Sequence, residues 1–339
     1  MAHARISASL PPDIDTTKAP IAFGKRALPK LNEELHSPDL LTQQRALMAL
    51  CDLVHDPENV YQAIEIGFLD SLKTLLLHRD STVRQKTTEI LSIMAMHNVG
   101  RQGLIQNGVI SALSKLLDDP VDICRKNTHQ IFEMMAKLPE GAADIICARL
   151  IPVLVFKLKT ESDEIQELIL STLSSCLRVE ASEALAAGAV TVLKKALTHS
   201  SAAIRSKAAW VLLDIGTHPE GKIVVCEEVV PVLVSLLEDT DPEVQASATG
   251  ALMFAAVKPQ GRFSALGAGA IPPLLKLVAE ETSRARLSAI KTLTMLAELP
   301  EGRKTLLDHT ATFEQCLNDP CKAVKRAAEI AISVIKWKP

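Results

Sequence analysis

A repeating segment organises this chain of 339 residues and constrains its fold more than any other feature. Typical copies are GFLDSLKTLL, GAVTVLKKAL and GAIPPLLKLV. Copies begin at positions 67, 108, 149, 188, 228 and 269, with weaker copies at 26 and 308, so successive starts lie 39 to 41 residues apart. A period of this length is the signature of stacked structural repeats. The chain is therefore predicted to be a solenoid of similar modules.

Apolar columns recur at helical spacing in every module. A large residue stands nine positions after each start, at Leu35, Leu76, Leu117, Leu158, Leu197, Leu237, Val278 and Leu317. A second segment follows each copy, and most of these segments have a small side chain at the fifth position and a large one four residues later, as in Ala208 and Leu212. Positions spaced by four share one face of an α-helix. Each module is therefore predicted to bury this face against the next module.

Helix breaks recur between the columns. Pro-Glu-Gly stands at 139–141, 219–221 and 300–302, with related sequences at 57–59 and 259–261. Proline suits the first turn of a helix, and glycine suits a sharp turn, as expected at Gly67, Gly108, Gly188 and Gly269. These breaks divide each repeat into three predicted helices.

The composition agrees with stacked helices and limits the classes of function. Aromatic residues make up 3% and apolar residues 47% of the chain, which favours an all-α protein. The net charge is −3, so the chain as a whole does not attract nucleic acid or an anionic membrane. The sequence contains neither a secretory signal pattern nor a long uncharged apolar run, and its seven cysteines form no C-x-x-C pair. We expect a soluble intracellular protein with reduced thiols in its core.

The order of a short helix, a glycine, a second helix and a long third helix resembles the armadillo repeat over residues 24–338. Residues 56–96 follow that family's pattern nearly position by position. The resemblance implies an all-α, right-handed superhelical solenoid of about eight three-helix repeats. We expect an irregular N-terminal arm over 1–22 and an armadillo-repeat domain over 23–339, with one partial and seven full repeats.

Motifs of catalysis and metal binding are missing from the sequence. H-E-x-x-H, G-x-S-x-G and the phosphate-binding P-loop do not occur. Cys316 and Cys321 have no histidine pair at ligand spacing, so buried thiols are favoured over a zinc site. The chain is predicted to be a non-enzyme without a cofactor, a metal ion or a small-molecule substrate.

The third helices supply the candidate protein-binding groove. Armadillo proteins that carry nuclear cargo have a ladder of Trp and Asn along these helices, and only Trp210 with Asp214 keeps a trace of it here. A nuclear-import receptor is therefore disfavoured. Flexible apolar residues in the same columns suit an amphipathic helix in a groove, although core packing is the alternative interpretation. The candidate groove residues are Met48, Met134, Trp210, Asp214, Phe254, Lys291 and Met295.

A basic column follows the start of most third helices, at Arg84, Arg125, Arg205, Arg286 and Lys325. It is interpreted as a solvated helix side, with an acidic partner face as the alternative. On this interpretation Arg205→Glu changes stability little. Leu212→Asp, in contrast, places a charge between two layers and is expected to cost about 3 kcal/mol or more.

Several stretches resemble one branch of the armadillo proteins more closely. Residues 13–58, GALMFAAV at 250–257, ALGAGAI at 265–271 and the closing RAAEIAISVIKWKP are similar to the radial spoke head 14 homologues. The resemblance implies a structural subunit of the radial spoke in the axoneme of motile cilia and flagella. Its implied partners are other spoke subunits, especially the helical scaffold protein of the stalk. The alternative is a soluble armadillo adaptor that binds extended peptide cargo in its concave groove.

Overall fold

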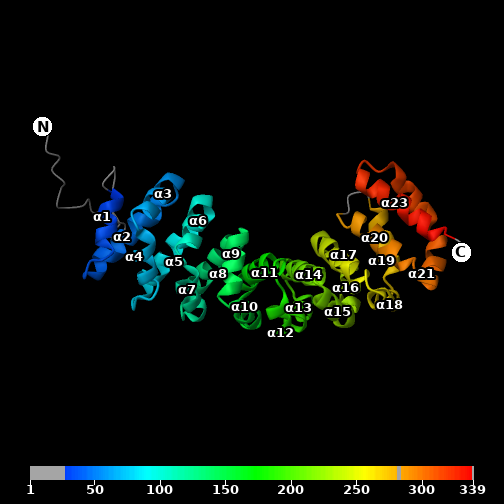
Figure 1. The fold of residues 1–339 in the computed structure, drawn as a ribbon, viewed down its shortest axis with the longest axis horizontal. Coiled ribbons are helices and arrows are strands. Elements are labelled where there is room, and N and C mark those ends of the chain that lie inside the picture. The colour runs from blue at the N-terminus through cyan, green and yellow to red at the C-terminus, as the bar shows by residue number, and fades with distance from the viewer. Residues whose placement is uncertain (1–26, 281–283, 338–339) are drawn as a thin grey trace. The chain divides into compact units, whose positions relative to one another are not determined.

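The regular structure of this chain is helical. In the computed structural model, which describes residues 27–280 and 284–337, twenty-three α-helices and three short 3₁₀ helices follow one another and no strand occurs (Figure 1). The predicted all-α repeat fold is confirmed. The expected arm over 1–22 lies outside the described residues, and the boundary at residue 23 stays a prediction.

The chain separates into two compact units, residues 1–144 and 145–339. The first unit begins with a layer of two helices, and two layers of three helices follow. Its helices are α1 (Ala27–Glu34), α2 (Leu40–Leu53), α3 (Pro57–Glu65), α4 (Phe68–Leu75), α5 (Ser81–Met96), α6 (Asn98–Gln106), α7 (Ile110–Leu113), η1 (Ser114–Asp118) and α8 (Asp122–Ala136). The division between the units falls within α9 (Pro139–Cys147).

The second unit repeats the three-helix layer, each time ending in a long third helix. Its helices after α9 are α10 (Ile151–Lys157), α11 (Asp163–Leu177), α12 (Ser182–Ala186), α13 (Ala189–Ala196), α14 (Ala202–Thr217), α15 (Pro219–Glu228), α16 (Val230–Ser235), η2 (Leu236–Glu238), α17 (Pro242–Ala255), α18 (Pro259–Gly267), α19 (Ile271–Ala279), α20 (Arg286–Leu296), α21 (Pro300–Leu307), α22 (Thr310–Gln315), η3 (Cys316–Asn318) and α23 (Lys322–Ile335).

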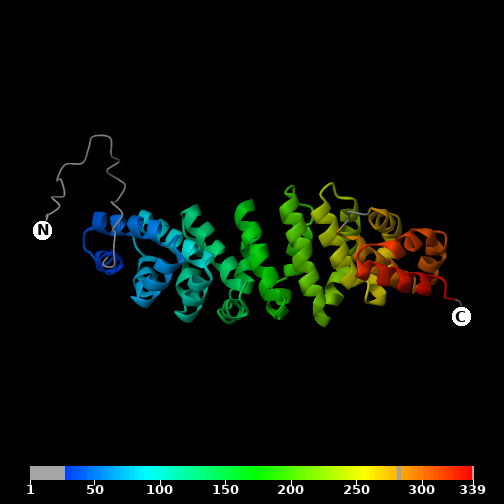
Figure 2. The ribbon, with the colours of Figure 1, turned by 90° about the horizontal axis from the view of Figure 1, so that it is seen from above.

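Third helices pack on one another in succession and form the core of each unit. In the first unit α5 lies between α2 and α8, and in the second α11, α14, α17, α20 and α23 pack in that order. Figure 2 shows the second series from above, in green through red. The small column lets these helices approach closely, and Ala208 and Leu212 are fully buried between them. Burial of the two columns confirms the predicted helical register.

The nine-position column is buried in every copy except the last. Seven of its eight members are at most 7% exposed, whereas Leu317 is 37% exposed. Leu317 lies in η3, whose layer packs against one neighbouring layer within the described residues. Its exposure therefore follows from the nearest-neighbour character of the stack.

The turn before five of the second helices, α4, α7, α10, α13 and α19, adopts the left-handed conformation. Gly67, Gly108, Gly188 and Gly269 have φ values of 91°, 61°, 72° and 76°, as the sequence predicts. Arg149 takes the equivalent place in the second unit with φ of 58°. A residue with a Cβ is strained in this region, so the turn at Arg149 opposes the preference of its own side chain.

The glycine that ends the Pro-Glu-Gly segments, and the related Pro-Gln-Gly segment at 259–261, has a packing role that the sequence did not reveal. A Cβ at Gly261 would lie 2.1 Å from the carbonyl oxygen of Ala255, and one at Gly221 would lie 2.3 Å from that of Ile215. These carbonyls belong to the last turn of the preceding third helix. Glycine is therefore required because the first helix begins in direct contact with the end of the helix before it.

Candidate protein-interaction groove

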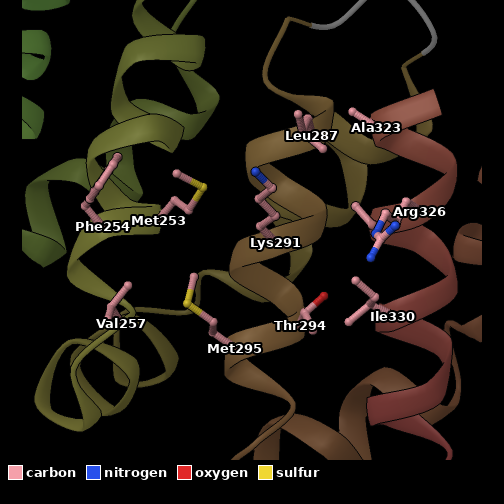
Figure 3. A pocket seen from close by; sticks show the side chains of 11 residues that line it. Met253, Phe254, Val257, Leu287, Lys291, Thr294, Met295, Ala323, Arg326 and Ile330 are labelled. Atoms are coloured by element: carbon pink, nitrogen blue, oxygen red, sulfur yellow. The ribbon is translucent and has the colours of Figure 1, made fainter. Parts of the chain in front are cut away.

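An apolar groove of about 550 Å³ lies along the third helices α17, α20 and α23 of the second unit (Figure 3). Alternate faces of each helix explain its position, because Leu252 and Leu293 point into the core while Phe254 and Met295 remain at the surface. The lining residues are Met253, Phe254 and Val257 at the end of α17, Leu287, Lys291, Thr294 and Met295 of α20, and Ala323, Arg326, Ala327 and Ile330 of α23.

The apolar side chains of this groove are partly open to solvent. Ile330 is 50% and Val257 is 49% exposed, and Met253, Phe254 and Met295 are half-buried. Contiguous exposed apolar surface is typical of an interaction site, whereas single exposed apolar residues are common on any protein. The two methionines have unbranched side chains that adapt to the shape of a partner.

The charged residues of the groove are all basic. Lys291 and Arg326 are exposed, and the lining contains no Asp or Glu. Neither cation forms a hydrogen bond or salt bridge with another residue in the part of the chain that the structure describes. The groove is therefore apolar at its base and positively charged at two points of its surface.

Three of the seven predicted groove residues meet in this cavity, namely Phe254, Lys291 and Met295. Sequence reasoning did not select Ile330 and Arg326, which line the same cavity from α23. Ile330 occupies the same column as Trp210 and Lys291, so the column itself was the signal that could have found it.

Trp210 lies elsewhere in the second unit. Its ring is 41% exposed and lines a separate hollow of about 470 Å³ between the start of α17 and α14, together with Lys207 and Glu243. This hollow contains charges of both signs, and Trp210 is its single large apolar residue.

Asp214 lies in the interior and not on the groove surface. It is 6% exposed, and the hydroxyl of Ser174 on α11 donates a hydrogen bond of 2.5 Å to its carboxylate. Burial raises the pKa of the Asp214 carboxyl, and the hydrogen bond from Ser174 opposes this shift only in part. The carboxylate thus joins two adjacent third helices and has no free surface for a peptide.

Met48 and Met134 belong to the first unit, on α2 and α8, and both are half-buried. The Lys137 ammonium lies 3.2 Å from the sulfur of Met134. These two residues remain a proposal as interaction residues, separate from the cavity of the second unit.

Three of the five residues in the basic column, Arg84, Arg205 and Arg286, form ion pairs between layers, which corrects the interpretation of these three as a solvated helix side. Arg205 donates from Nε and Nη2 to the carboxylate of Asp239 at 2.8 Å each, and from Nη1 to the carbonyl oxygens of His199 and Ser200 at 2.9 Å. A forked arrangement of this kind suits the planar guanidinium. Arg205 therefore contacts its own loop and the loop of the next layer. The premise of the harmless Arg205→Glu substitution, a solvated side chain, is wrong.

The same clamp occurs twice more in the described residues. Arg84 donates from Nε to Asp119 at 2.7 Å, and Arg286 lies 2.7 Å from Asp319. Burial by itself raises the pKa of Asp119 and Asp239, but the hydrogen bonds from Arg84 and Arg205 and from backbone amides outweigh it and the net pKa of each carboxyl is lowered. We call these three pairs the interlayer clamps.

The cysteines fall into two groups. Burial raises the pKa of Cys51 and Cys176 to about 12 and that of Cys124 to about 11, so these thiols stay protonated at neutral pH. Cys147 and Cys321 are exposed, which corrects the expectation that all the cysteines lie in the core.

Candidate ligand and membrane sites were sought over the same residues. Within 27–280 and 284–337, no group of three or more His, Cys, Asp or Glu residues is arranged to hold a metal ion. Over these same ranges, no helix combines the length and apolar character that crossing a membrane requires.

Layered helices with an open groove define the class: an armadillo-type repeat solenoid with the architecture of a protein-interaction scaffold. A family model described as HEAT repeats matches residues 190–294. The crystal structure of an engineered protein matches with a TM-score of 0.85 and 26% identity, over 92% of this chain and 79% of that one. A designed armadillo repeat protein in complex with the peptide (KR)4 matches with a TM-score of 0.63 and 27% identity, over 67% of this chain and 99% of that one.

Radial spoke protein 14 of Chlamydomonas reinhardtii is similar to part of this chain. The two sequences are 28% identical over 120 residues, which are 35% of this chain and 31% of the relative. The aligned segment therefore spans less than a third of that relative. Within that segment the resemblance to the radial spoke 14 proteins is confirmed.

Proposed function

We propose that this chain is a non-catalytic scaffold subunit of the radial spoke in the axoneme of motile cilia and flagella. It docks helical subunits of the spoke along its third helices and helps to transmit signals between the central pair and the dynein arms. Its partners are other spoke subunits, especially the helical scaffold protein of the stalk, and not nucleic acid, membranes or small molecules.

The similarity to Radial spoke protein 14 carries this proposal. The groove along α17, α20 and α23 supports it, because partly exposed methionine, phenylalanine and isoleucine side chains suit the apolar face of a helix. Stacked layers that contact only their neighbours also deform elastically, which suits a subunit under mechanical load.

Fractionation of axonemes tests the proposal. The tagged full-length chain is expressed in ciliated cells, and spokes extracted with salt are separated by density-gradient sedimentation. We expect the chain to co-sediment with known spoke subunits and to be recovered in similar stoichiometry by mass spectrometry. Recovery in the soluble cytoplasmic fraction alone, with spokes that lack the chain, would contradict it.

A soluble adaptor for extended peptides is the second candidate. The match to a designed armadillo repeat protein favours it, since that protein is in complex with the basic peptide (KR)4. The positively charged groove and the buried position of Asp214 disfavour a basic peptide here. Binding of (KR)4 that is lost in Trp210→Ala would support the adaptor, and binding that is absent or unchanged would argue against it.

A further inference from the structure

The groove of the second unit combines apolar surface with two cations that have no partner within the described residues. Another cation on the same helices, Arg286 of α20, differs from these two because it lies 2.7 Å from the Asp319 carboxylate. Lys291 and Arg326 remain available for charges outside the chain. A partner that carries carboxylates at matching places gains electrostatic complementarity, which favours the correct partner and disfavours a basic one.

The backbone requirements of the partner decide its conformation. An extended peptide has N–H and C=O groups that need hydrogen-bond partners when they leave water. In the ladder described above, Asn side chains supply these partners. Phe254 and Met295 occupy two of the Asn positions here, and their side chains cannot form such hydrogen bonds. An α-helix satisfies its backbone internally, so it can lie on an apolar surface without that penalty.

The dimensions of the groove set the length of the partner. Three successive third helices line it, and packed helices lie about 8–10 Å apart, so a segment that crosses α17, α20 and α23 spans roughly 20 Å. At 1.5 Å per residue this corresponds to about 13 helical residues, or nearly four turns. Apolar residues about seven positions apart share one face of a helix and lie about 10 Å from one another, so they would face Phe254, Met295 and Ile330 in turn.

We propose that the groove along α17, α20 and α23 binds an acidic amphipathic α-helix of another protein. The apolar face of this helix contacts Phe254, Met295 and Ile330, and its Asp or Glu side chains pair with Lys291 and Arg326. The inference deepens the proposed function, on which it rests, by giving the chemistry of the partner that this surface selects.

Three synthetic peptides of 18 residues test the proposal on the full-length chain by fluorescence anisotropy. The first is a model helix with Leu on one face and Glu flanking that face, the second has Lys in place of Glu, and the third repeats the first with two central prolines that prevent helix formation. We expect the Glu helix to bind about tenfold more tightly than the Lys helix, since Glu attracts Lys291 and Arg326 whereas Lys repels them. The proline peptide is expected not to bind.

Charge reversal in the protein provides the reciprocal arm. The variant with Lys291→Glu and Arg326→Glu is expected to lose its binding of the Glu helix and to bind the Lys helix instead. The matched control carries Lys276→Glu and Lys304→Glu, which change the net charge equally at exposed sites outside the groove. Ile330→Glu, at a half-exposed position, is expected to weaken binding of the Glu helix, and circular dichroism is expected to show an intact fold.

Several results would overturn the inference. Equal binding of the Glu and Lys helices, equal binding of the proline peptide, or an unchanged preference after charge reversal each contradicts it. A dimer seen by analytical ultracentrifugation that dissociates in Ile330→Glu would show that a second copy of the chain occupies the groove. Failure of the proposed function is distinct, because a chain absent from spokes would still bind the Glu helix, and a chain present in spokes could fail this test.

Discussion

Arg149 is the residue at which the repeat departs most clearly from its own pattern. It adopts φ of 58° where four other repeats have glycine, and its side chain is 80% exposed, although it pairs with Glu183, whose side chain is 16% exposed. We predict that Arg149→Gly stabilises the protein by about 1 kcal/mol, because relief of left-handed strain exceeds the entropic cost of glycine in the unfolded chain.

Urea unfolding followed by circular dichroism measures this change. Arg149→Ala is the matched control, since it removes the pairing with Glu183 and keeps the strained backbone. A variant with glycine that is no more stable than the alanine control would show that the turn is not strained.

Asp214 allows a second prediction at the scale of one residue. Its pKa is raised by burial, so the ionised form is less favourable in the folded protein than in the unfolded chain. Asp214→Asn keeps an acceptor for the hydroxyl of Ser174 and removes the buried charge. We expect the free energy of unfolding at pH 7 to be unchanged or higher in this variant.

The measurement for Asp214 is the dependence of stability on pH. A raised carboxyl pKa in the fold means that the protein gains stability relative to Asp214→Asn as pH falls through the folded pKa. Asp214→Asn that is destabilised by more than about 1 kcal/mol at pH 7 would show instead that the charge is well compensated.

At the scale of elements, the interlayer clamps fix how one third helix lies against the next loop. Arg205→Ala is predicted to destabilise the protein by about 2 kcal/mol, because it leaves the nearly buried Asp239 carboxylate without its cation. Lys195→Ala, at an exposed position of α13, is the control and is expected to have little effect. A double-mutant cycle with Asp239→Asn measures the coupling, and a coupling near zero would contradict the clamp.

The clamps also predict the response of the fold to acid. The pKa of Asp239 is lowered in the folded protein, so its stabilising contribution is complete above the unfolded pKa, near pH 4, and is lost as pH falls through the folded value. Asp239→Asn should therefore lose less stability than the natural chain between about pH 5 and pH 2. Parallel pH profiles for the two proteins would contradict this assignment.

Helix faces were predictable from the sequence, whereas the pairing between layers was only partly visible. Leu212 and Leu252 could be placed in the core because helical spacing repeats in each module and burial follows from it. Leu212 is fully buried, so the expected cost of about 3 kcal/mol for Leu212→Asp stays a prediction with a sound structural basis.

The clamps escaped prediction because their partners lie 33 to 35 residues apart. A signal was nevertheless present, since Arg84, Arg205 and Arg286 are each followed in the next module by an aspartate two positions after the large apolar column. The arginine positions by themselves are typical of a solvated helix side, and only the aspartates of the next module indicate the ion pairs.

The groove was predicted in part for a similar reason. Phe254 and Met295 were identified because they occupy the positions of a peptide-binding ladder, but Asp214 at the equivalent position is buried. Whether such a residue reaches the surface depends on how its neighbours pack, here on Ser174 of the adjacent helix. Periodicity therefore predicts the helix face on which a side chain lies, but not whether that side chain is exposed or buried by its neighbours.

At the scale of the whole molecule, we propose that the repeat stack holds a helical partner of the radial spoke. The most direct test places the photo-crosslinking residue benzoyl-phenylalanine at position 330 of the full-length chain, within assembled spokes, and identifies the crosslinked peptide by mass spectrometry. We predict a crosslink from position 330 to an acidic helical segment of another spoke subunit, with none from a probe at position 304. Crosslinks confined to position 304, or to no spoke subunit, would contradict it.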